Sequence, residues 1–451
     1  NSAEDDMRLN QLLKHLTYEH VQGSQSREIT DICYHSGNVR EGSLFVCLKG
    51  LHNDGHDYLQ GALEAGAAAV VVAAENVVPL DNDALLYTEQ FGVRIAEIID
   101  RWQVSVVIAA DTRHALAELA AAFFDYPAAK LRMVGITGTK GKTTTAYLLS
   151  AILRESGHKT GMIGTNGVYI GEDHYPTMNT TPESYDLHRY FAQMVEEGCD
   201  CCVMEVSSQA FKMYRVAGIT FDYGIFTNIS PDHIGPDEHA DFAEYLYYKK
   251  QIFVQSRFAL VNVDDEHFEE IVKDIPCEWA GFGMGANATY QAENLHYVSE
   301  PDFVGIEFDI RGAHEIPVRV NIPGKFNVYN ALSASAVALK AGVPAEKLQH
   351  ALEHLKIDGR MEIVYTSEQC CVIVDYAHNA VSMESLLETL REYHPKRLVV
   401  VFGCGGNRSK ERRYSMGEIG GRMADLSILT ADNSRFEKVE DILADIRGSI
   451  E

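Results

Sequence analysis

The stretch that decides the fold is Val134-Gly135-Ile136-Thr137-Gly138-Thr139-Lys140-Gly141-Lys142-Thr143-Thr144-Thr145. It joins an apolar strand to a helix through a loop of small residues. Such a loop lets backbone N–H groups converge on phosphate oxygens, while a lysine adds positive charge and a threonine hydroxyl can hold Mg²⁺. The helix that follows directs the positive end of its dipole at the same ligand. The stretch therefore predicts a nucleoside-triphosphate site.

The loop departs from the strict Walker pattern at one position. That pattern requires a glycine five residues before Gly141, and this chain has Ile136 there. We expect a variant phosphate loop in which Lys142 supplies the positive charge and Thr143 the Mg²⁺-binding hydroxyl. The alternative interpretation is a glycine- and threonine-rich turn that binds no ligand.

Composition limits the class of protein. A chain of 451 residues, 46% of them hydrophobic, predicts two or three domains with sizeable cores. The formal charge of −26, from 39 Lys and Arg against 65 Asp and Glu, argues against nucleic-acid binding, which needs a basic surface. The sequence shows no apolar run of membrane-spanning length and no signal-peptide pattern. We expect a cytoplasmic monomer with no membrane insertion.

Apolar runs and turn signals divide the chain into three predicted domains. Residues 1–109 are typical of a small α/β unit that recognises a ligand. Residues 110–357 hold the phosphate loop, and their apolar strands alternate with helix-like stretches. This alternation predicts a parallel, doubly wound sheet. The helix-like stretches of this domain are at 115–124, 242–253 and 328–341.

Residues 358–451 repeat the strand–helix pattern. Their apolar runs at 371–375, 397–402 and 426–430 are typical of buried strands separated by helices. We therefore expect a second, Rossmann-like α/β domain. It stops soon after its third strand, which we interpret as a truncated domain.

Polar side chains follow two of the central strands where each strand ends. Glu205 ends an apolar strand at the carboxyl edge of the predicted sheet, where ligands bind in such folds. Beside a phosphate loop its carboxylate fits a Mg²⁺ ligand, although it can also be an ordinary strand-end glutamate. His233 stands just past the strand that ends at Thr227, with a metal or phosphate role and a purely structural one both open.

Two further groups of cations remain ambiguous from the residues alone. Lys249 and Lys250 lie in a helix-like stretch and would ordinarily be assigned to its solvated face. The glycine-rich turn Gly403-Cys404-Gly405-Gly406 is followed by four cationic side chains within 408–413. We interpret this turn as a second anion site, with a solvated basic helix start as the alternative.

Together these motifs resemble the ATP-dependent Mur ligases, and most closely the MurE branch of that family. The resemblance covers almost the whole chain, with the order and spacing of the motifs retained. It rests on Gly138-Thr139-Lys140-Gly141-Lys142-Thr143, Asn179-Thr180-Thr181-Pro182, Glu205-Val206-Ser207-Ser208, Thr227-Asn228-Ile229-Ser230-Pro231-Asp232-His233, Asn327-Val328-Tyr329-Asn330, Gly359-Arg360-Met361-Glu362, Asp375-Tyr376-Ala377-His378, Gly403-Cys404-Gly405-Gly406-Asn407-Arg408 and Asp432-Asn433-Ser434-Arg435.

The resemblance implies a carboxylate-activating ligase with three α/β domains. ATP would phosphorylate the terminal carboxylate of a UDP-N-acetylmuramoyl dipeptide, and the amine of an amino acid would attack the acyl phosphate. The implied ATP-binding residues are Gly138, Thr139, Lys140, Gly141, Lys142, Thr143, Thr144, Asn330, Arg360, Asp375 and His378. The implied catalytic residues are Lys142, Glu205, His233 and Lys249, and the implied Mg²⁺ ligands are Thr143, Glu205, His233 and Lys249.

The family also uses a carbamylated lysine, whose anion bridges to the second metal ion. Family spacing selects Lys249 for this role over Lys250, although the segment from His233 to Lys249 is two residues longer than usual. The implied substrate-binding residues are Ser36 for uridine, then Asn179, Thr180, Thr181, Ser207 and Arg215 for the muramoyl peptide, and Arg413, Asp432, Asn433 and Arg435 for the amino acid.

The resemblance also bears on which amino acid is added. Members that add meso-diaminopimelate carry an arginine in the loop after the last strand seen here, and it pairs with the distal carboxylate of the substrate. Arg435 occupies that position, with Ser434 where the family has proline. We therefore expect meso-diaminopimelate. The alternatives are a ligase for L-lysine or another amino acid, a folylpolyglutamate-synthase-like ligase, and a Mur-like ATP-binding scaffold without ligase activity.

Overall fold

The computed structural model describes residues 7–50, 53–231, 234–235, 238–301, 303–357, 359 and 361–450. The chain forms two compact units. Unit 1 comprises Asn1–Ala146, Gly157–Val261 and Asp265–Trp279, and unit 2 comprises Tyr147–Ser156, Asn262–Asp264 and Ala280–Glu451.

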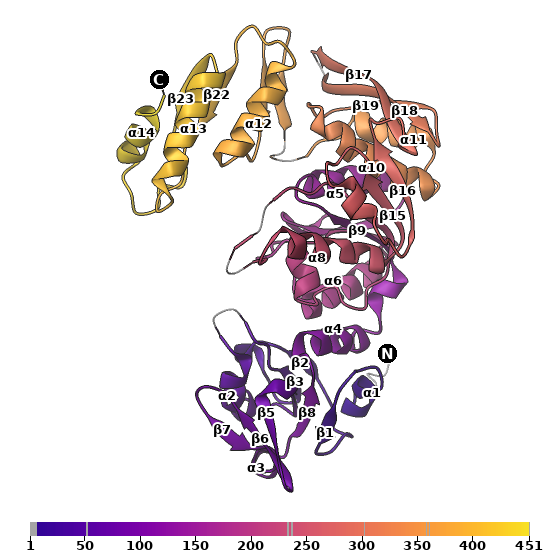
Figure 1. Ribbon diagram of the computed structural model, residues 1–451, viewed down its shortest axis with the longest axis vertical. Coiled ribbons are helices and arrows are strands. Elements are labelled where there is room, and N and C mark those ends of the chain that lie inside the picture. Colours follow the sequence, from indigo (N-terminus) through magenta and orange to yellow (C-terminus); the bar gives the residue numbers. More distant parts are fainter. Residues whose placement is uncertain are drawn as a thin grey trace. The chain divides into compact units, whose positions relative to one another are not determined.

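The N-terminal part of unit 1 is built on a five-stranded sheet in the order β1-β8-β4-β3-β2 (Figure 1). Strands β2, β3, β4 and β8 are parallel, and β1 is antiparallel to β8. A small antiparallel sheet, β5-β6-β7, accompanies it. The elements are α1 (Leu9–Leu13), β1 (His20–Gln22), β2 (Asp31–Cys33), β3 (Ser43–Val46), α2 (Leu59–Glu64), β4 (Ala69–Ala73), β5 (Val77–Leu80), β6 (Asp83–Tyr87), β7 (Gly92–Arg94), α3 (Ile95–Trp102), β8 (Ser105–Ala109) and α4 (Thr112–Phe123). This is the small α/β unit that the sequence predicts.

The central part of unit 1 contains the predicted parallel sheet, in the order β10-β13-β9-β14-β15. Antiparallel strands β11 and β12 extend it beyond β10. The elements are β9 (Arg132–Thr137), α5 (Lys142–Glu155), β10 (Thr160–Gly164), β11 (Gly167–Ile170), β12 (Asp173–Tyr175), α6 (Ser184–Glu196), β13 (Cys201–Glu205), α7 (Ser208–Lys212), β14 (Phe221–Phe226), α8 (Phe242–Val254), β15 (Ser256–Asn262) and α9 (Phe268–Val272).

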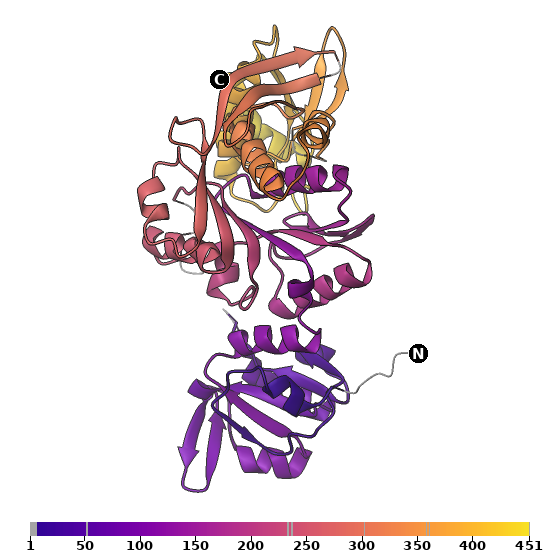
Figure 2. The same cartoon turned by 90° about the vertical axis from the view of Figure 1, so that its right-hand side faces the viewer.

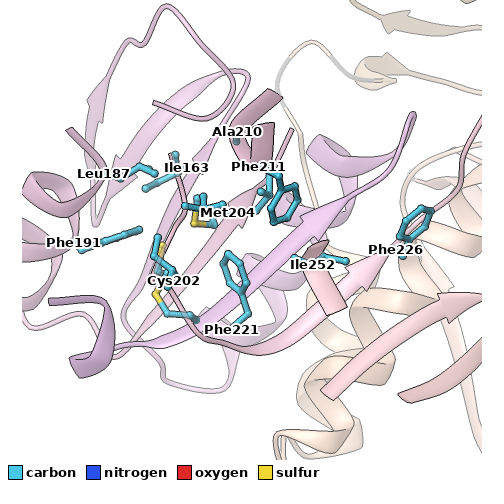
Figure 3. Packing of buried hydrophobic residues seen from close by; sticks show 14 of the residues in the cluster. Ile163, Leu187, Phe191, Cys202, Met204, Ala210, Phe211, Phe221, Phe226 and Ile252 are labelled. Carbon is cyan, nitrogen blue, oxygen red and sulfur yellow. The ribbon is translucent and has the colours of Figure 1, made fainter. Parts of the chain in front are cut away.

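The core of the central part fixes the strands whose ends carry the site. Cys202 and Met204 from β13 pack with Phe221 from β14 and Ile252 from α8, and all four side chains are fully buried (Figure 3). Burial on both faces explains why these strands are near-continuous apolar runs in the sequence. The packing therefore holds the carboxyl ends of β9, β13 and β14 side by side.

The segment of unit 2 from Ala280 onwards contains antiparallel strands that the sequence analysis did not predict. β17 and β18 form a long antiparallel pair, and β19 pairs with β18 (Figure 2). The elements are β16 (Glu278–Gly283), β17 (Tyr290–Glu300), β18 (Phe303–Gly312), β19 (Ile316–Val320), α10 (Phe326–Lys340) and α11 (Ala345–Glu353). Helix α10 matches the stretch predicted at 328–341 and buries most of its alanine and serine side chains.

The C-terminal part of unit 2 has the predicted alternation of strands and helices. β22 and β23 are parallel, β20 and β21 are antiparallel, and α13 packs against both α12 and α14 (Figure 1). The elements are β20 (Glu362–Thr366), β21 (Cys371–Val374), α12 (Ala380–Arg391), β22 (Val399–Phe402), α13 (Lys410–Met423), β23 (Leu426–Leu429) and α14 (Val439–Arg447).

These C-terminal strands are not buried, and this corrects the sequence prediction. Exposure alternates along β22 and β23, and Val401 and Ile428 are exposed. An apolar run alone does not say how many faces of a strand are covered, and here one face packs on the helices while the other is open.

Among the described residues, no helix is both long enough and apolar enough to span a membrane.

Candidate functional site

The phosphate loop between β9 and α5 takes a shape that only glycine permits at its first position. Gly138 has φ of 143°, and a Cβ atom there would lie 1.8 Å from Oγ1 of Thr227. That hydroxyl donates to the carbonyl oxygen of Lys140 at 2.7 Å. The side chain at the end of β14 thus occupies the space beside Gly138 and holds the far side of the loop.

A second residue after β14 fixes the loop by its backbone and its side chain. The N–H groups of Thr139 and Lys140 donate to the carbonyl oxygen and the Oδ1 of Asn228 at 3.0 and 2.9 Å. Asn228 Nδ2 donates back to Lys140 at 2.9 Å. Helix α5 begins at Lys142, so its first turn presents the N–H groups that the start of a helix leaves available to an anion.

Glu205 and Thr143 meet at the start of this helix. Glu205 is 1% exposed, and its Oε1 accepts a hydrogen bond from Thr143 Oγ1 at 2.9 Å. Thr165, just past β10, donates to the same carboxylate through its N–H at 3.0 Å and its hydroxyl at 3.2 Å. A Cβ at Gly164 would lie 2.2 Å from Oε1. The site thus gathers hard oxygen donors of the kind that Mg²⁺ prefers.

Two lysines converge on the phosphate loop from different helices. Lys142 Nζ and Lys249 Nζ each donate to the carbonyl oxygen of Gly138 at 2.8 Å. Lys249 is 2% exposed and lies over the ring of Tyr245, 4.7 Å from its centroid. The Tyr245 hydroxyl in turn lies 3.1 Å from Thr139 Oγ1.

The neighbouring Lys250 points elsewhere. Its Nζ donates to the carbonyl oxygens of Glu270 and Lys273 at 2.9 and 2.7 Å. The solvated-face interpretation therefore fails for Lys249, which is buried, while Lys250 serves a contact between α8 and the segment around α9. Of the two neighbouring lysines on α8, Lys249 contacts the phosphate loop, and it is the one that family spacing selects.

The predicted peptide-binding residues are assembled next to Glu205. Thr181 Oγ1 donates to the Glu205 carbonyl at 3.0 Å and accepts from the Ser207 N–H at 3.1 Å. Arg215 Nη1 donates to the Thr181 carbonyl at 3.1 Å. Thr180 Oγ1 lies 3.1 Å from the hydroxyl of Thr165. Asn179 precedes them in an exposed position.

An ionic group links this segment to a pocket in the N-terminal part of the same unit. Glu183 lies 3.2 Å from Arg215 Nε and 3.4 Å from Arg113 Nη1. Glu183 and Arg113 also line a pocket of about 400 Å³ that includes Ser36. The full lining is Tyr34, His35, Ser36, Phe45, Leu48, Gly50, Asn53, Gly55, Tyr58, Arg113 and Glu183.

Two crossed hydrogen bonds position that pocket. The Tyr34 hydroxyl donates to Asp186 at 2.5 Å, and the Tyr185 hydroxyl donates to Asp31 at 2.7 Å. Burial, together with the nearby carboxylate, raises the pKa of both tyrosines, so both stay protonated donors at neutral pH.

The remaining predicted nucleotide residues lie in unit 2. Asn330 is buried, and its Nδ2 donates to Asn327 Oδ1 at 2.9 Å. Asp375 accepts from the N–H groups of Met361 and Ala377, each at 2.8 Å, and His378 is exposed. Two other predicted residues, His233 and Arg360, lie outside the described residues.

The predicted amino-acid loop pairs with the glycine-rich turn. Gly406 N donates to the Asn433 carbonyl at 2.8 Å, and a Cβ at Gly406 would lie 1.9 Å from the Ser434 carbonyl oxygen. This close approach explains the glycine-rich turn without an anion. Arg435 is exposed, with φ of 49° and its N–H directed at Asn433 Oδ1 at 3.3 Å. Asp432 is also exposed.

Arg413 does not join this exposed loop. It is 1% exposed, and its guanidinium donates to Asp445 at 2.9 Å and to Glu437 at 2.7 Å. A buried guanidinium needs such carboxylates to offset its lost hydration. Arg413 therefore pairs with two carboxylates of its own domain through Nη1 and Nη2, and the amino-acid contact predicted for it stays a prediction.

Sequence reasoning missed several residues that complete the site. Thr165 and Gly164 shape the carboxylate of Glu205, Tyr245 connects Lys249 with the phosphate loop, and Glu183 joins Arg113 to Arg215. Thr165 had a usable signal, since it is a polar residue directly after an apolar strand. The other contacts depend on tertiary packing.

Comparison with protein families gives three consecutive matches. Residues 28–124 match the model described as Mur ligase family, catalytic domain, and residues 136–338 match the Mur ligase middle domain. Residues 359–451 match the Mur ligase, glutamate ligase domain.

Curated relatives and solved structures agree with these matches. A Clostridium acetobutylicum protein named UDP-N-acetylmuramoyl-L-alanyl-D-glutamate–2,6-diaminopimelate ligase 1 is 40% identical over 98% of this chain and 86% of its own length. A Clostridium perfringens protein named as a ligase of the same kind is 36% identical over 98% of this chain and 87% of its own length. A solved structure with that enzyme name superposes on this chain with a TM-score of 0.74 at 23% sequence identity, covering 99% of this chain and 86% of the other. The structure of MurF from Acinetobacter baumannii superposes with a TM-score of 0.62 at 20% sequence identity, covering 98% of this chain and 87% of the other. The chain belongs to the Mur ligase family.

Proposed function

We propose that this Mur ligase is an ATP-dependent amide ligase that adds meso-diaminopimelate to UDP-N-acetylmuramoyl-L-alanyl-D-glutamate in peptidoglycan synthesis. The observation that carries the proposal is the pairing of Thr143 with the buried Glu205 at the phosphate loop. It stands in a chain that is similar over 98% of its length to proteins named for this reaction.

The phosphate loop fits ATP and Mg²⁺. Lys142 and the first turn of α5 would hold the phosphates, while Thr143 and Glu205 would supply oxygen ligands to the metal. The bound ion would neutralise charge between the nucleotide and the substrate carboxylate. The loop residues Gly138, Thr139, Lys140, Gly141 and Thr144 would line the nucleotide, with Asn330, Arg360, Asp375 and His378 contributing from the rest of the chain.

We also propose that Lys249 is carbamylated in the working enzyme. Two ammonium groups on one carbonyl oxygen repel each other in a site with little water, and Lys249 is 2% exposed. Reaction of its neutral amine with CO₂ forms an N–C bond, releases one proton and leaves an anion. That anion would pair with Lys142 and, with His233, would serve a second metal ion.

The substrate would lie along the surface from the Ser36 pocket to Glu205. The uridine would occupy the pocket, where Arg113 supplies positive charge. The dipeptide would follow the segment of Asn179, Thr180, Thr181, Ser207 and Arg215. Thr181 of this segment bonds to the Glu205 main-chain carbonyl, and the Thr180 hydroxyl lies beside Thr165, which donates to the Glu205 carboxylate. The terminal carboxylate of the substrate would then lie near the phosphate loop, as transfer of a phosphoryl group requires.

The reaction then has two steps. ATP transfers its γ-phosphoryl group to the substrate carboxylate, forming an acyl phosphate and releasing ADP. The amine of the amino acid attacks the acyl carbon, phosphate leaves, and one proton is released. The positive charges at the phosphate loop favour both steps because each moves negative charge onto phosphate oxygens.

Arg435 would select the amino acid. Its exposed guanidinium, in the loop that also holds Asp432 and Asn433, can pair with the distal carboxylate of meso-diaminopimelate. L-Lysine offers an ammonium group there instead, which Arg435 would repel. We further propose the domain division 1–109, 110–357 and 358–451, and a monomer that acts in the cytoplasm.

The test is ATP turnover with defined substrates. Phosphate release should require both the UDP-muramoyl dipeptide and an amino acid, with meso-diaminopimelate used faster than L-lysine at equal concentration. Faster use of L-lysine would overturn the specificity. Phosphate release with a folate in place of the UDP-dipeptide, or ATP binding without ligation, would overturn the function.

A further inference from the structure

A second cluster of metal-binding side chains lies at the opposite edge of the central sheet. His158 follows α5, and Asp200 and Cys201 stand at the start of β13. One donor atom from each residue, a ring nitrogen, a carboxylate oxygen and a thiol sulfur, lies within 4.8 Å of the other two. His158 Nδ1 is 2.7 Å from Asp200 Oδ2.

The backbone holds these three residues in register. Thr160 pairs with Cys201 across the parallel strands β10 and β13. The Asp200 N–H donates to the Lys159 carbonyl at 2.9 Å, and the Asp200 carbonyl accepts from Arg132 N at 2.9 Å. The cluster is therefore part of the sheet edge and not of a loose loop.

The cluster is separate from the ATP site. Cys201 and Glu205 are the first and last residues of β13, and a strand of this length spans about 13 Å. Cys201 is 1% exposed, while the side chains of His158 and Asp200 are 27% and 55% exposed. An ion can thus reach His158 and Asp200 from solvent, while Cys201 would be a buried ligand.

We propose that His158, Asp200 and Cys201 bind a zinc-class divalent cation. A thiolate, an imidazole and a carboxylate form the mixed donor set that Zn²⁺ and Co²⁺ accept, whereas Mg²⁺ takes oxygen ligands and would remain at Glu205. Binding releases the Cys201 thiol proton to solvent. The ring proton of His158 moves through solvent from Nδ1, where it is donated to Asp200, to Nε2, so that Nδ1 can bind the metal. Water completes the tetrahedron.

The bound ion would tie the segment after α5 to the start of β13. Because the ion binds the folded arrangement and not the unfolded chain, it should raise the thermal midpoint. The proposed function assigns no role in ligation to these three side chains, so activity serves as a check of folding.

Co²⁺ titration of the full chain in excess Mg²⁺ tests the proposal. We expect one Co²⁺ per chain, a thiolate-to-cobalt charge-transfer band, and displacement of Co²⁺ by Zn²⁺. Cys201→Ser should abolish the band, while Cys202→Ser, at a fully buried position that packs in the core (Figure 3), should keep it.

His158→Gln and Asp200→Asn provide a second measurement, since both positions are accessible and tolerate change. Each should weaken Co²⁺ affinity on the order of tenfold or more and leave ligase activity unchanged. Absence of the band in the unsubstituted chain, its persistence in Cys201→Ser, or unchanged affinity in both other variants would overturn the proposal.

Discussion

Lys142 and Lys249 donate to the same carbonyl oxygen, that of Gly138, each at 2.8 Å. One lysine comes from the start of α5 and the other from the buried face of α8. Two positive charges so close together in a poorly hydrated site are unfavourable unless one of the two amino groups loses its charge or becomes an anion. This relationship makes Lys249 the first residue at which to test the proposed function.

Lys249→Ala should lose nearly all ligase activity, because the proposed carbamate anion is then missing. A small carboxylate such as acetate should restore part of the activity by replacing the anion. The measurement is phosphate release with and without added acetate. Lys250→Ala is the matched control and should remain active, since Lys250 contacts Glu270 and Lys273 instead. If Lys250→Ala, and not Lys249→Ala, lost ligase activity and regained it with acetate, the assignment of the carbamate to Lys249 would be wrong.

Lys142→Ala should abolish ligation and leave the fold intact. Removing one charge-assisted contact to a transferring phosphoryl group costs about 3–4 kcal/mol, or a hundredfold or more in rate. Circular dichroism and the thermal midpoint should be unchanged, because Lys142 lies partly exposed at a helix start. Unchanged turnover would refute the ATP site.

Gly164→Ala tests the position of the Glu205 carboxylate. The added Cβ would meet Glu205 Oε1 at 2.2 Å, so the carboxylate must move away from Thr143 and Thr165. We expect the Mg²⁺ concentration for half-maximal activity to rise severalfold. Gly61→Ala, where a Cβ meets no atom within 4 Å, should leave it unchanged. An equal response of both variants would argue against a metal role for Glu205.

Arg435→Ala tests the choice of amino acid. Loss of the guanidinium should slow the meso-diaminopimelate reaction about tenfold or more, corresponding to about 1.4–3 kcal/mol, and should favour L-lysine relative to it. Lys438→Ala, which removes an exposed charge from the same region, is the control. The assignment fails if Arg435→Ala leaves the diaminopimelate rate unchanged.

His188 should make stability depend on pH. It is 3% exposed in α6, and among the described residues neither ring nitrogen has a hydrogen-bond partner. Burial lowers its pKa from 6.5 to about 4. The unfolded chain then binds a proton that the folded chain does not, so stability falls as pH falls below 6.5, with the loss complete near pH 4. Between pH 7 and pH 5 the loss is roughly 2 kcal/mol.

Chemical denaturation at several pH values measures this effect. His188→Leu should flatten the pH dependence in that window, whereas His296→Leu, at an exposed position on β17, should not. The prediction fails if the two variants give the same slope.

Local sequence patterns predicted the elements that carry the phosphate site. The apolar run before Gly138 is β9, the helix after it is α5, and the stretch at 242–253 is α8. These predictions rest on periodicity and loop chemistry, which act over a few residues. The same reasoning assigned Lys249 to solvent, because helical periodicity does not reveal which neighbours cover a face.

Local sequence patterns did not predict the contacts between residues that lie far apart in the chain. Arg413 is neutralised by Glu437 and Asp445, both more than twenty residues further along, and only packing reveals that pairing. The antiparallel strands β17 to β19 were missed because polar and charged residues interrupt their apolar positions, so that no long apolar run marks them in the sequence. Tertiary structure decides both.

The crossed hydrogen bonds of Tyr34 with Asp186 and Tyr185 with Asp31 connect the N-terminal part of unit 1 to the first turn of α6. Each side of the contact supplies one tyrosine donor and one aspartate acceptor. A sliding movement of one side along the other would therefore break both hydrogen bonds. We expect these two bonds to restrain the spacing between the Ser36 pocket and the Glu205 carboxylate. Under the proposed function, a stem one residue shorter would end before the phosphate loop, and one residue longer would overshoot it. The ligase would thus recognise where its substrate ends without reading every residue on the way.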